Sequence, residues 1–127
     1  MKVGVIILAW NSEKRILDCL NSLNSYCDDF NTYVVDNDSK DNTVQIIKKS
    51  FPNINLILSN SNLGFSGGNN LGFTQAINDG CDYVVLLNDD VIILEDFISP
   101  LVRKMENDKT IGSIGPCFLN FRKGFIS

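Results

Sequence analysis

One stretch, residues 83–90, combines an unbroken apolar run with an abrupt polar end. Tyr83–Leu87 reads Tyr-Val-Val-Leu-Leu, and Asn88, Asp89 and Asp90 follow it directly. A continuous apolar run of this length is typical of a central parallel strand that helices cover on both faces. Two adjacent carboxylates repel each other, so their position after a core strand is costly unless a cation or hydrogen-bond donors lie beside them. An ordinary polar turn is the alternative, and other segments must decide between the two.

Strand-like runs alternate with helical periodicity along the whole chain. Further strands are expected at Val3–Ala9, Thr32–Val35, Ile54–Ser59 and Ile111–Phe118. Helices are expected over Ser12–Tyr26, from a cap at Asp38, Ser39 or Asp41 to about Ser50, from about Leu71 to Gly80, and around Pro100 in a first turn. This alternation predicts an α/β fold with right-handed crossovers. We expect an open, mainly parallel sheet of order 3-2-1-4 plus a fifth strand, helices on both faces, and no regular structure over Asn120–Ser127.

The composition excludes several classes of function. The 127 residues include no histidine, which removes Ser-His-Asp and Cys-His catalysis and histidine-ligated metals. A net charge of -4 argues against a nucleic-acid partner. The four cysteines lack Cys-x-x-Cys spacing, so we expect reduced thiols and a cytoplasmic protein. The length fits a single domain over residues 1–127, and no apolar run approaches the length of a membrane span.

The segment Asn60–Asn70 is unusually rich in glycine and asparagine. Glycines at 64, 67 and 68 would let the backbone approach a ligand closely or take positive φ, and the asparagines offer donors and acceptors without charge. The spacing matches neither the dinucleotide fingerprint nor a P-loop. A flexible solvated loop is the alternative, but Leu63 and Phe65 have little use in such a loop. We therefore expect a loop that contacts a ligand.

Polar residues follow three of the expected strands. They are Trp10-Asn11, Asp36-Asn37 and Asn88-Asp89-Asp90. In an open parallel sheet, ligands bind beyond the carboxyl ends of the strands where the strand order reverses. With the order 3-2-1-4, that crevice lies between the first and fourth strands. We expect a nucleotide and Mg²⁺ or Mn²⁺ there, because amides and carboxylates can bind a base and ribose while the cation needs few carboxylates besides diphosphate oxygens.

Four segments carry a family resemblance: Val-Ile-Ile-Leu-Ala-Trp-Asn at 5–11, Val-Val-Asp-Asn-Asp-Ser-Lys-Asp-Asn-Thr at 34–43, Asn-Leu-Gly-Phe-Ser-Gly-Gly-Asn-Asn-Leu-Gly at 62–72, and Leu-Leu-Asn-Asp-Asp at 86–90. In this order they resemble glycosyltransferase family 2, whose members have the GT-A fold. The third segment especially resembles the rhamnosyltransferase-like branch. The resemblance runs from residue 1 to about residue 120 and implies the Rossmann-like nucleotide-binding half of a GT-A domain.

The resemblance implies roles for the residues after the first two strands. Trp10, Asn11 and Asp36 would contact the nucleoside, and Asp36 would accept a hydrogen bond from the imide N–H of a pyrimidine. Asn37 stands where many relatives have a second aspartate, so its role in nucleotide-sugar binding is less defined. Four residues of the glycine-rich segment would lie alongside the base and sugar: Gly67, Gly68, Asn69 and Asn70.

The resemblance also implies a metal site after the fourth strand. Asn88, Asp89 and Asp90 form an Asn-Asp-Asp variant of the family's Asp-x-Asp-type motif. Within it, Asn88 and Asp89 would belong to the nucleotide-sugar site, with Asp89 holding the ribose, and Asp90 would bind Mg²⁺ or Mn²⁺. In this family the catalytic base lies deeper in the domain than residue 127, so no base is assigned among these residues.

The implied function is transfer of a sugar, with inversion, from a UDP- or dTDP-linked donor to a saccharide or lipid-linked acceptor. Such an enzyme would serve cell-wall or polysaccharide biosynthesis in the cytoplasm, or at the inner face of the membrane. We interpret the chain as the donor-binding half of a truncated domain. A non-catalytic nucleotide-sugar-binding and metal-binding module is the alternative. A nucleotidyltransferase is a third reading, although Asn11–Arg15 lacks the glycine expected of its triphosphate loop. A half-domain exposes a sheet edge, so we also expect self-association.

Overall fold

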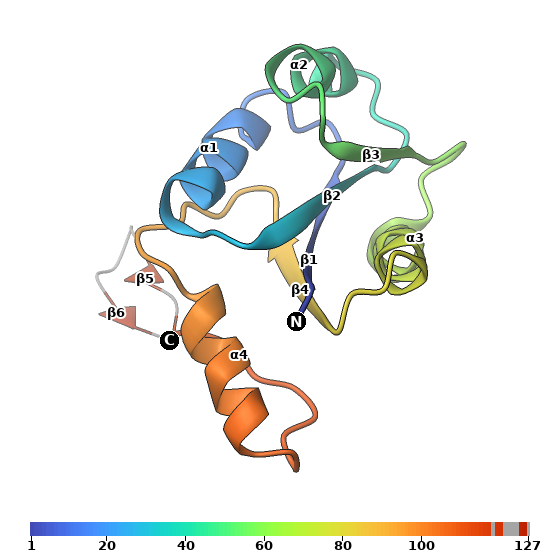
Figure 1. The fold of residues 1–127 in the computed structure, drawn as a ribbon. Helices are drawn as coiled ribbons and strands as arrows, with labels where there is room; N and C mark the ends of the chain where they lie inside the picture. The colour runs from blue at the N-terminus through green and yellow to red at the C-terminus, as the bar shows by residue number, and fades with distance from the viewer. Residues whose placement is uncertain (118, 121–124, 127) are drawn as a thin grey trace. The chain divides into compact units, whose positions relative to one another are not determined.

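The computed structural model describes residues 1–117, 119–120 and 125–126. The chain divides into two compact units, Met1–Leu94 and Glu95–Ser127. The first contains β1 (Val3–Ala9), α1 (Ile16–Tyr26), β2 (Phe30–Asp36), α2 (Thr43–Ser50), β3 (Asn55–Leu58), α3 (Gly64–Asn78) and β4 (Tyr83–Asn88) (Figure 1). The second contains α4 (Ile98–Asn107), β5 (Leu119–Asn120) and β6 (Phe125–Ile126). All the sequence-predicted site residues therefore belong to the first unit.

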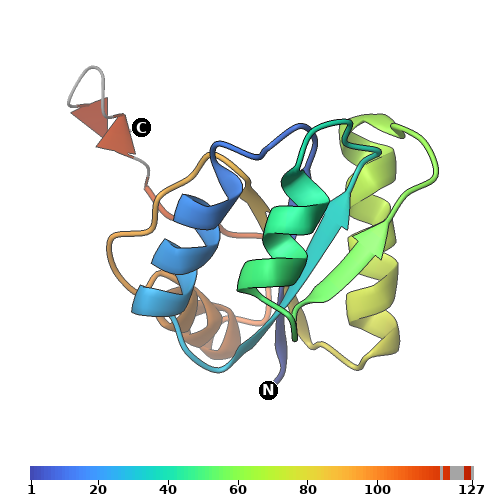
Figure 2. The ribbon, with the colours of Figure 1, turned by 90° about the horizontal axis from the view of Figure 1, so that it is seen from above.

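The first unit is built on a four-stranded sheet. Its order is β3-β2-β1-β4, and every neighbouring pair is parallel, which confirms the predicted topology. Helices α1 and α2 cover one face of the sheet and α3 covers the other (Figure 2). Ala9 is in register with Asp36, and Leu8 is in register with Asn88. The polar residues at the ends of β1, β2 and β4 therefore lie together at the carboxyl end of the sheet.

Strand β1 is the centre of the core. Val5, Ile6 and Ile7 are fully buried, as an apolar strand with helices on both faces should be. Alternate residues serve the two faces because side chains along a strand point to opposite sides. On the face of α3, Ile6 packs in one cluster with Tyr33 and Ala76. The apolar side chains of β1 thus pack against the helices on both faces of the sheet.

Strand β4 lies at an edge of the described sheet. Among the described strands it pairs only with β1, and Leu86 is 45% exposed whereas Leu87 is buried. The expectation of a central strand covered on both faces is therefore wrong for residues 83–87. An apolar run indicates that a strand is buried, but it does not indicate how many strands pair with it. The strand that has neighbours on both sides and helices on both faces is β1. Self-association through the β4 edge stays a prediction.

The expected fifth strand is not found. Residues 111–117 form no strand, and Phe118 lies outside the described residues. Gly112, Gly115 and Pro116 explain the absence, because glycine weakens strands and proline cannot donate to a strand ladder. Instead, β5 and β6 pair with each other in an antiparallel arrangement, so the expectation of no strand over Asn120–Ser127 is also wrong.

The predicted glycine-rich loop is largely helical. Helix α3 begins at Gly64, where φ is +70°, and continues through the segment expected to be a loop. A Cβ atom added to Gly72 would lie 2.5 Å from Ile6 Cγ2, and one added to Gly68 would lie 2.4 Å from Leu8 Cδ1. These two glycines therefore let α3 approach the sheet closely. Sequence analysis missed the helix because glycine and asparagine have low helix propensity, which tertiary packing overrides here.

The remaining helices agree better with the sequence. Helix α4 contains Pro100 in its first turn, as predicted, and Gly80 takes a φ of +78° just after α3. The Asp96 carboxylate accepts hydrogen bonds from the amides of Ile98 (3.0 Å) and Ser99 (3.2 Å) at the start of α4. No helix within residues 1–117 is long and apolar enough to cross a bilayer.

Replacing Gly72 with alanine tests the close approach of α3 to β1. The added methyl group would press on Ile6, a stiff β-branched residue in the core, so we expect Gly72→Ala to lower the free energy of unfolding by about 1–2 kcal/mol, despite alanine's better helix propensity. Urea denaturation measures the change. Asn70→Ala, at an exposed position of the same helix, is the control and should leave stability unchanged or slightly raised. Equal stability of the two variants would contradict the packing role of Gly72.

Candidate functional site

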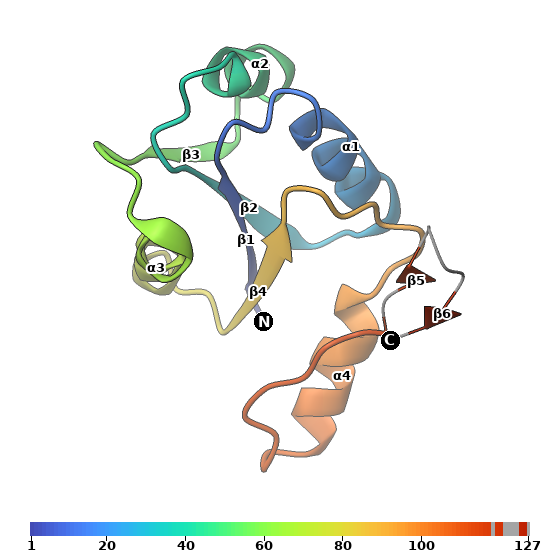
Figure 3. The same cartoon turned by 180° about the vertical axis from the view of Figure 1, so that it is seen from behind.

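The candidate site lies where β1, β2 and β4 end. The segments that follow these three strands leave the sheet at the same end (Figure 3). The strand ends and these segments carry the residues of the Asn-Asp-Asp motif together with Trp10, Asn11 and Asp36, as the sequence predicts. The structure therefore brings together the three polar strand ends that sequence analysis singled out.

Asp36 has a buried carboxylate that is only half satisfied. The residue is 4% exposed, and its Oδ2 atom accepts a hydrogen bond from the amide of Ser39 at 3.1 Å. Its Oδ1 atom is buried and has no hydrogen-bond partner among the described residues. Leaving a buried acceptor unpaired costs about 1–3 kcal/mol, and more for a charged group. A ligand that donates a hydrogen bond to Oδ1 would recover that cost.

Asp89 is held by two donors at one of its oxygens. Its Oδ2 atom accepts hydrogen bonds from the hydroxyl of Ser12 and from Nη2 of Arg15, the latter at 2.9 Å. Within the described part of the chain, no hydrogen bond to Asp89 Oδ1 is formed. The hydrogen bond and the charge of Asp89 raise the pKa of Arg15 above its ordinary value. The end of β4 is thereby tied to the segment between β1 and α1.

Ser12 also links the segments that follow β1 and β2. Its amide donates to Thr43 Oγ1 at 2.7 Å, and the Thr43 hydroxyl donates to Asp41 Oδ1 at 2.5 Å. The amide of Glu13 donates to Asp41 Oδ2 at 3.1 Å. Burial opposes ionisation of Asp41, but the hydrogen bonds from Thr43 and Glu13 lower its pKa below the ordinary value. This network fixes the relative positions of two of the three strand ends.

Trp10 and Asn11 border the site differently. The Trp10 side chain is exposed, and its backbone amide donates to Ser12 Oγ at 3.1 Å. Asn11 takes a φ of +49° and uses Oδ1 to accept the amide of Lys40 at 2.8 Å, while its own amide donates to Ser39 Oγ at 2.9 Å. Asn11 therefore shapes the turn after β2, and its predicted contact with a nucleoside stays a prediction.

The side chain of Asn37 is engaged in holding the start of α3. It is buried, and its Oδ1 accepts the amide of Leu63 at 2.9 Å. Its Nδ2 donates to Asn62 Oδ1 at 3.1 Å and to the carbonyl of Gly64 at 3.2 Å. These three contacts use both polar atoms of the amide. A ligand-binding role for Asn37 stays a prediction, and the structural role was not foreseen from the sequence.

The four residues of the glycine-rich segment lie in the first two turns of α3. A Cβ atom on Gly68 would lie 3.3 Å from Asn37 Cγ, so this glycine is next to the end of β2. Asn69 is buried and its Nδ2 donates to the carbonyl of Phe65 at 2.9 Å, whereas Asn70 is exposed and Gly67 half-buried. Their contacts with a base or sugar stay predictions.

Asn88 and Asp90 are exposed at the end of β4. Within the described residues, no group of three or more histidine, cysteine, aspartate or glutamate side chains could hold a metal ion. A cation at Asp90 would need further ligands from a bound molecule. Behind the motif, burial and the charges of Asp89 and Asp90 raise the pKa of Cys19 to about 12, so this thiol is neutral and serves packing.

Four residues of the site were not predicted from the sequence: Ser12, Arg15, Ser39 and Thr43. Ser12 was expected only as the start of a helix and Ser39 only as a possible helix cap, and the other two were not assigned a role. Their one sequence signal is their short distance along the chain from Asn11 and Asp36. Besides local contacts, each of them makes a hydrogen bond to a residue 28 or more positions away, up to 77 between Ser12 and Asp89, which no local pattern predicts.

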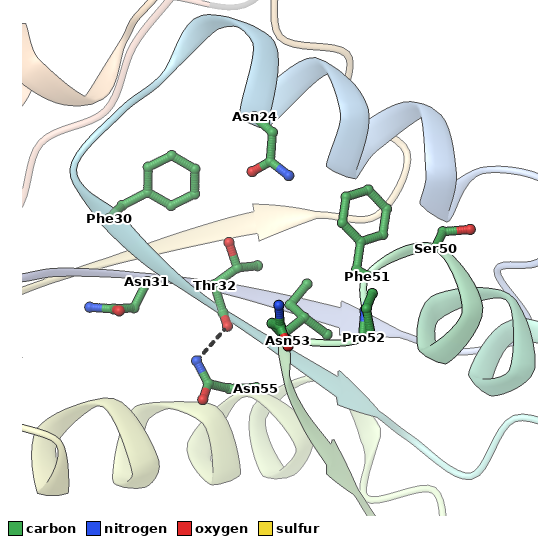
Figure 4. A pocket seen from close by; sticks show the side chains of 10 residues that line it. Asn24, Phe30, Asn31, Thr32, Ser50, Phe51, Pro52, Asn53 and Asn55 are labelled. Carbon is green, nitrogen blue, oxygen red and sulfur yellow. Dashed lines mark hydrogen bonds between the residues drawn. The ribbon is translucent and has the colours of Figure 1, made fainter.

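An open hollow of about 370 Å³ lies at the opposite end of the sheet. The rings of Phe30 and Phe51 flank it, and the amide of Asn24 lies between them in the view of Figure 4. Asn55 Nδ2 donates to the carbonyl of Thr32 at 3.0 Å along its wall. The described residues that line the hollow include no charged side chain, so none of them offers a carboxylate or an amine as an acid or a base.

Comparison with known proteins identifies relatives of the chain. The model of the family "Glycosyl transferase family 2" matches residues 4–126. The uncharacterized glycosyltransferase YfnE of Bacillus subtilis (strain 168) is 30% identical over 116 residues, which are 87% of this chain and 29% of YfnE. The SPbeta prophage-derived glycosyltransferase SunS, also of B. subtilis, is 47% identical over 51 residues, which are 39% of this chain and 11% of SunS.

Comparison with solved structures also finds proteins that are similar to this chain. S. aureus TarS 1-349 in complex with UDP-GlcNAc is 30% identical, with a TM-score of 0.71, over 86% of this chain and 32% of that one. The chain thus spans about a third or less of the length of these relatives. The match confirms the GT-A type of fold that the resemblance implies.

Replacing Asn37 with aspartate tests how the start of α3 is held. The introduced carboxylate can still accept from Leu63, but it faces two acceptors, Asn62 Oδ1 and the carbonyl of Gly64, without a donor. We expect Asn37→Asp to lower the free energy of unfolding by about 1–3 kcal/mol at neutral pH. At acidic pH the protonated carboxyl regains a donor, so the deficit relative to wild type should shrink. Urea denaturation at both pH values measures it.

The matched control for this experiment is Asn62→Asp. Asn62 Oδ1 accepts both the amide of Gly64, at 2.8 Å, and Asn37 Nδ2, so a carboxylate at this position keeps both contacts. Its effect on stability should be clearly smaller. Similar losses in the two variants would show that the donor role of Asn37 is unimportant.

Proposed function

Because the chain belongs to glycosyl transferase family 2, we propose that it forms the donor-binding part of a glycosyltransferase that uses a UDP-linked sugar. One observation carries the proposal, the buried Oδ1 atom of Asp36 that lacks a partner among the described residues. The imide N–H of uracil would satisfy this acceptor, whereas cytosine presents an acceptor at the same ring position. Thymine has the same imide, and the TarS complexes with UDP and UDP-GlcNAc favour UDP over dTDP.

The other strand ends would bind the rest of the donor. Asp89 Oδ2 accepts hydrogen bonds from Ser12 and Arg15, so the Oδ1 atom of Asp89 is the acceptor available for a ribose hydroxyl. Trp10 and Asn11 border the same end of the sheet and would contact the nucleoside. The first turns of α3, with Gly67, would lie along the base and sugar. In this arrangement the nucleoside lies across the ends of β1, β2 and β4.

Asp90 fits a divalent cation that a bound diphosphate shares. Mg²⁺ binds through one or two carboxylates together with phosphate oxygens, so one exposed carboxylate after β4 is compatible with Mg²⁺ or Mn²⁺. When bound, such a cation would neutralise charge on the diphosphate as it leaves the sugar. The sugar would pass, with inversion, to a saccharide or lipid-linked acceptor, and no residue of this chain is assigned as the base.

A nucleotide-sugar-binding module without transfer is the second candidate. Asp36 and Asp89 are each anchored by protein donors at one oxygen. We assign the other oxygen of each to the nucleoside, so neither is placed to deprotonate an acceptor hydroxyl. Donor binding without turnover, across varied acceptors, would favour this candidate.

Exchanging UDP for CDP tests the role of Asp36. We expect wild type to bind UDP at least tenfold more tightly than CDP, because only uracil donates to Oδ1. In Asp36→Asn the amide group can donate where Oδ1 accepted, so affinity for UDP should fall about 10–100-fold and the preference should shift towards CDP. Isothermal titration calorimetry measures both ligands. Asp38→Asn, in the same turn, is the control, and equal binding of UDP and CDP by wild type would refute the assignment.

The metal proposal is tested by titrating UDP with and without Mn²⁺. Wild type should bind UDP more tightly when Mn²⁺ is present, and Asp90→Ala should lose that gain while keeping its metal-free affinity. The reason is that Asp90 supplies the protein's carboxylate to a cation whose remaining ligands come from phosphate and water. Asp82→Ala, with an exposed carboxylate before β4, is the control. A gain that persists in Asp90→Ala would place the cation elsewhere.

A further inference from the structure

We propose that Ser12 is a positioning residue that orients the Asp89 carboxylate for the ribose of the donor. The inference rests on the proposed function and adds a residue to it. Neither the apolar and polar pattern of the sequence nor the Asn-Asp-Asp motif assigns a role to Ser12 beyond a helix start. The structure places it instead at the junction of β1, β2 and β4.

Ser12 is held in a fixed position. The residue is fully buried, and its amide donates to Thr43 Oγ1 at 2.7 Å, which anchors its backbone to the start of α2. A buried residue with an anchored backbone has few alternative rotamers for its hydroxyl. The Oγ atom is therefore a fixed point between the segments that follow β1 and β2.

The surroundings of Ser12 also fix the direction of its hydroxyl proton. The amide of Trp10 donates to Oγ at 3.1 Å, and Arg15 Nη2 approaches it at 3.5 Å. Both groups are donors only, so the hydroxyl acts as their acceptor and its single proton remains for Asp89. The Ser12 hydroxyl accordingly donates to Asp89 Oδ2. Hydrogen bonds to a carboxylate are about twice as strong as neutral ones.

Two donors at Oδ2 make the Asp89 carboxylate asymmetric. Oδ2 is saturated by Ser12 and Arg15, whereas Oδ1 receives no hydrogen bond within the described residues. The side chain is 16% exposed, so Oδ1 can meet a bound molecule without a large rearrangement. Rotation of the carboxylate would break the bond to Ser12, and this resistance to rotation is what we assign to the serine.

Ser12 contributes more to this orientation than Arg15. The Arg15 side chain is 47% exposed, and exposed ion pairs contribute little because water and salt screen them. The Ser12 bond is made by a buried donor whose backbone cannot move away. The prediction is therefore specific: loss of the Ser12 hydroxyl weakens binding of the ribose hydroxyls and leaves the other contacts of the nucleotide intact.

A thermodynamic cycle with two ligands tests this inference. UDP and 2′,3′-dideoxyuridine diphosphate are titrated into wild type, Ser12→Ala, Asp89→Ala and the double variant. We expect Ser12→Ala to weaken UDP about tenfold and the dideoxy ligand hardly at all. In the Asp89→Ala background, the serine substitution should have no further effect on UDP, because the two residues act as one unit. Ser25→Ala, an exposed position on α1, is the control.

A second pair of variants separates positioning from folding. Ser12→Thr and Ser12→Val have nearly the same shape and impose the same strain, but only threonine keeps a hydroxyl. We expect Ser12→Thr to retain the preference for UDP over the dideoxy ligand and Ser12→Val to lose it, with similar thermal unfolding temperatures. Equal weakening of both ligands by Ser12→Ala, or identical behaviour of the threonine and valine variants, would overturn the inference and indicate a purely structural serine.

The same titrations distinguish failure of the proposed function. If wild type binds UDP but shows no ribose-specific effect of Ser12, only the inference on Ser12 is wrong. If folded wild type binds neither ligand, the uridine site itself is refuted and the positioning role with it.

Discussion

The parallel pairing of β1 with both β2 and β4 is the constraint on which the rest of this structure depends. The register places Ala9 beside Asp36 and Leu8 beside Asn88, so three polar strand ends meet at the carboxyl end of the sheet. That pairing is possible because β1 is apolar at nearly every position and is buried on both faces. Burial of the strand thus provides the free energy that holds polar groups together at its end.

The carboxylates of Asp36 and Asp89 are arranged alike, although Asp36 is buried and Asp89 is partly exposed. One oxygen of Asp36 is anchored by a backbone amide, and one oxygen of Asp89 is anchored by two side-chain donors. The other oxygen of Asp36 is buried without a partner among the described residues, and that of Asp89 accepts none of the hydrogen bonds described for this part of the chain. Anchoring costs little because the donors already belong to neighbouring turns, and it fixes where the free oxygen points. Such preorganisation favours ligands whose donors match those directions. A rigid set of acceptors is what recognition of a nucleoside requires.

Features that depend on neighbouring residues in the chain were predicted correctly from the sequence, whereas features that depend on tertiary packing were not. The apolar strands and the polar strand ends follow from composition and alternation along the chain. The order 3-2-1-4, which the structure confirms, additionally required the supposition that the first strand pairs with the second and the fourth. The helical state of residues 64–70 does not, because Gly68 and Gly72 appear as helix breakers until their contacts with Leu8 and Ile6 are known. Similarly, Leu86 looks like a core residue by pattern, yet its strand lies at an edge of the described sheet.

The sequence by itself determined the fold class, the family and which polar residues follow which strands, because these depend on periodicity and on motifs that are continuous in the chain. Only the tertiary structure decided which atoms of those residues are free to bind. Asn37 and Asp36 are neighbours in sequence, but the amide of Asn37 is used to hold α3 while Asp36 keeps one oxygen unpaired. Hydrogen bonds between residues far apart in sequence make that difference, and they exist only once the strands and helices have packed.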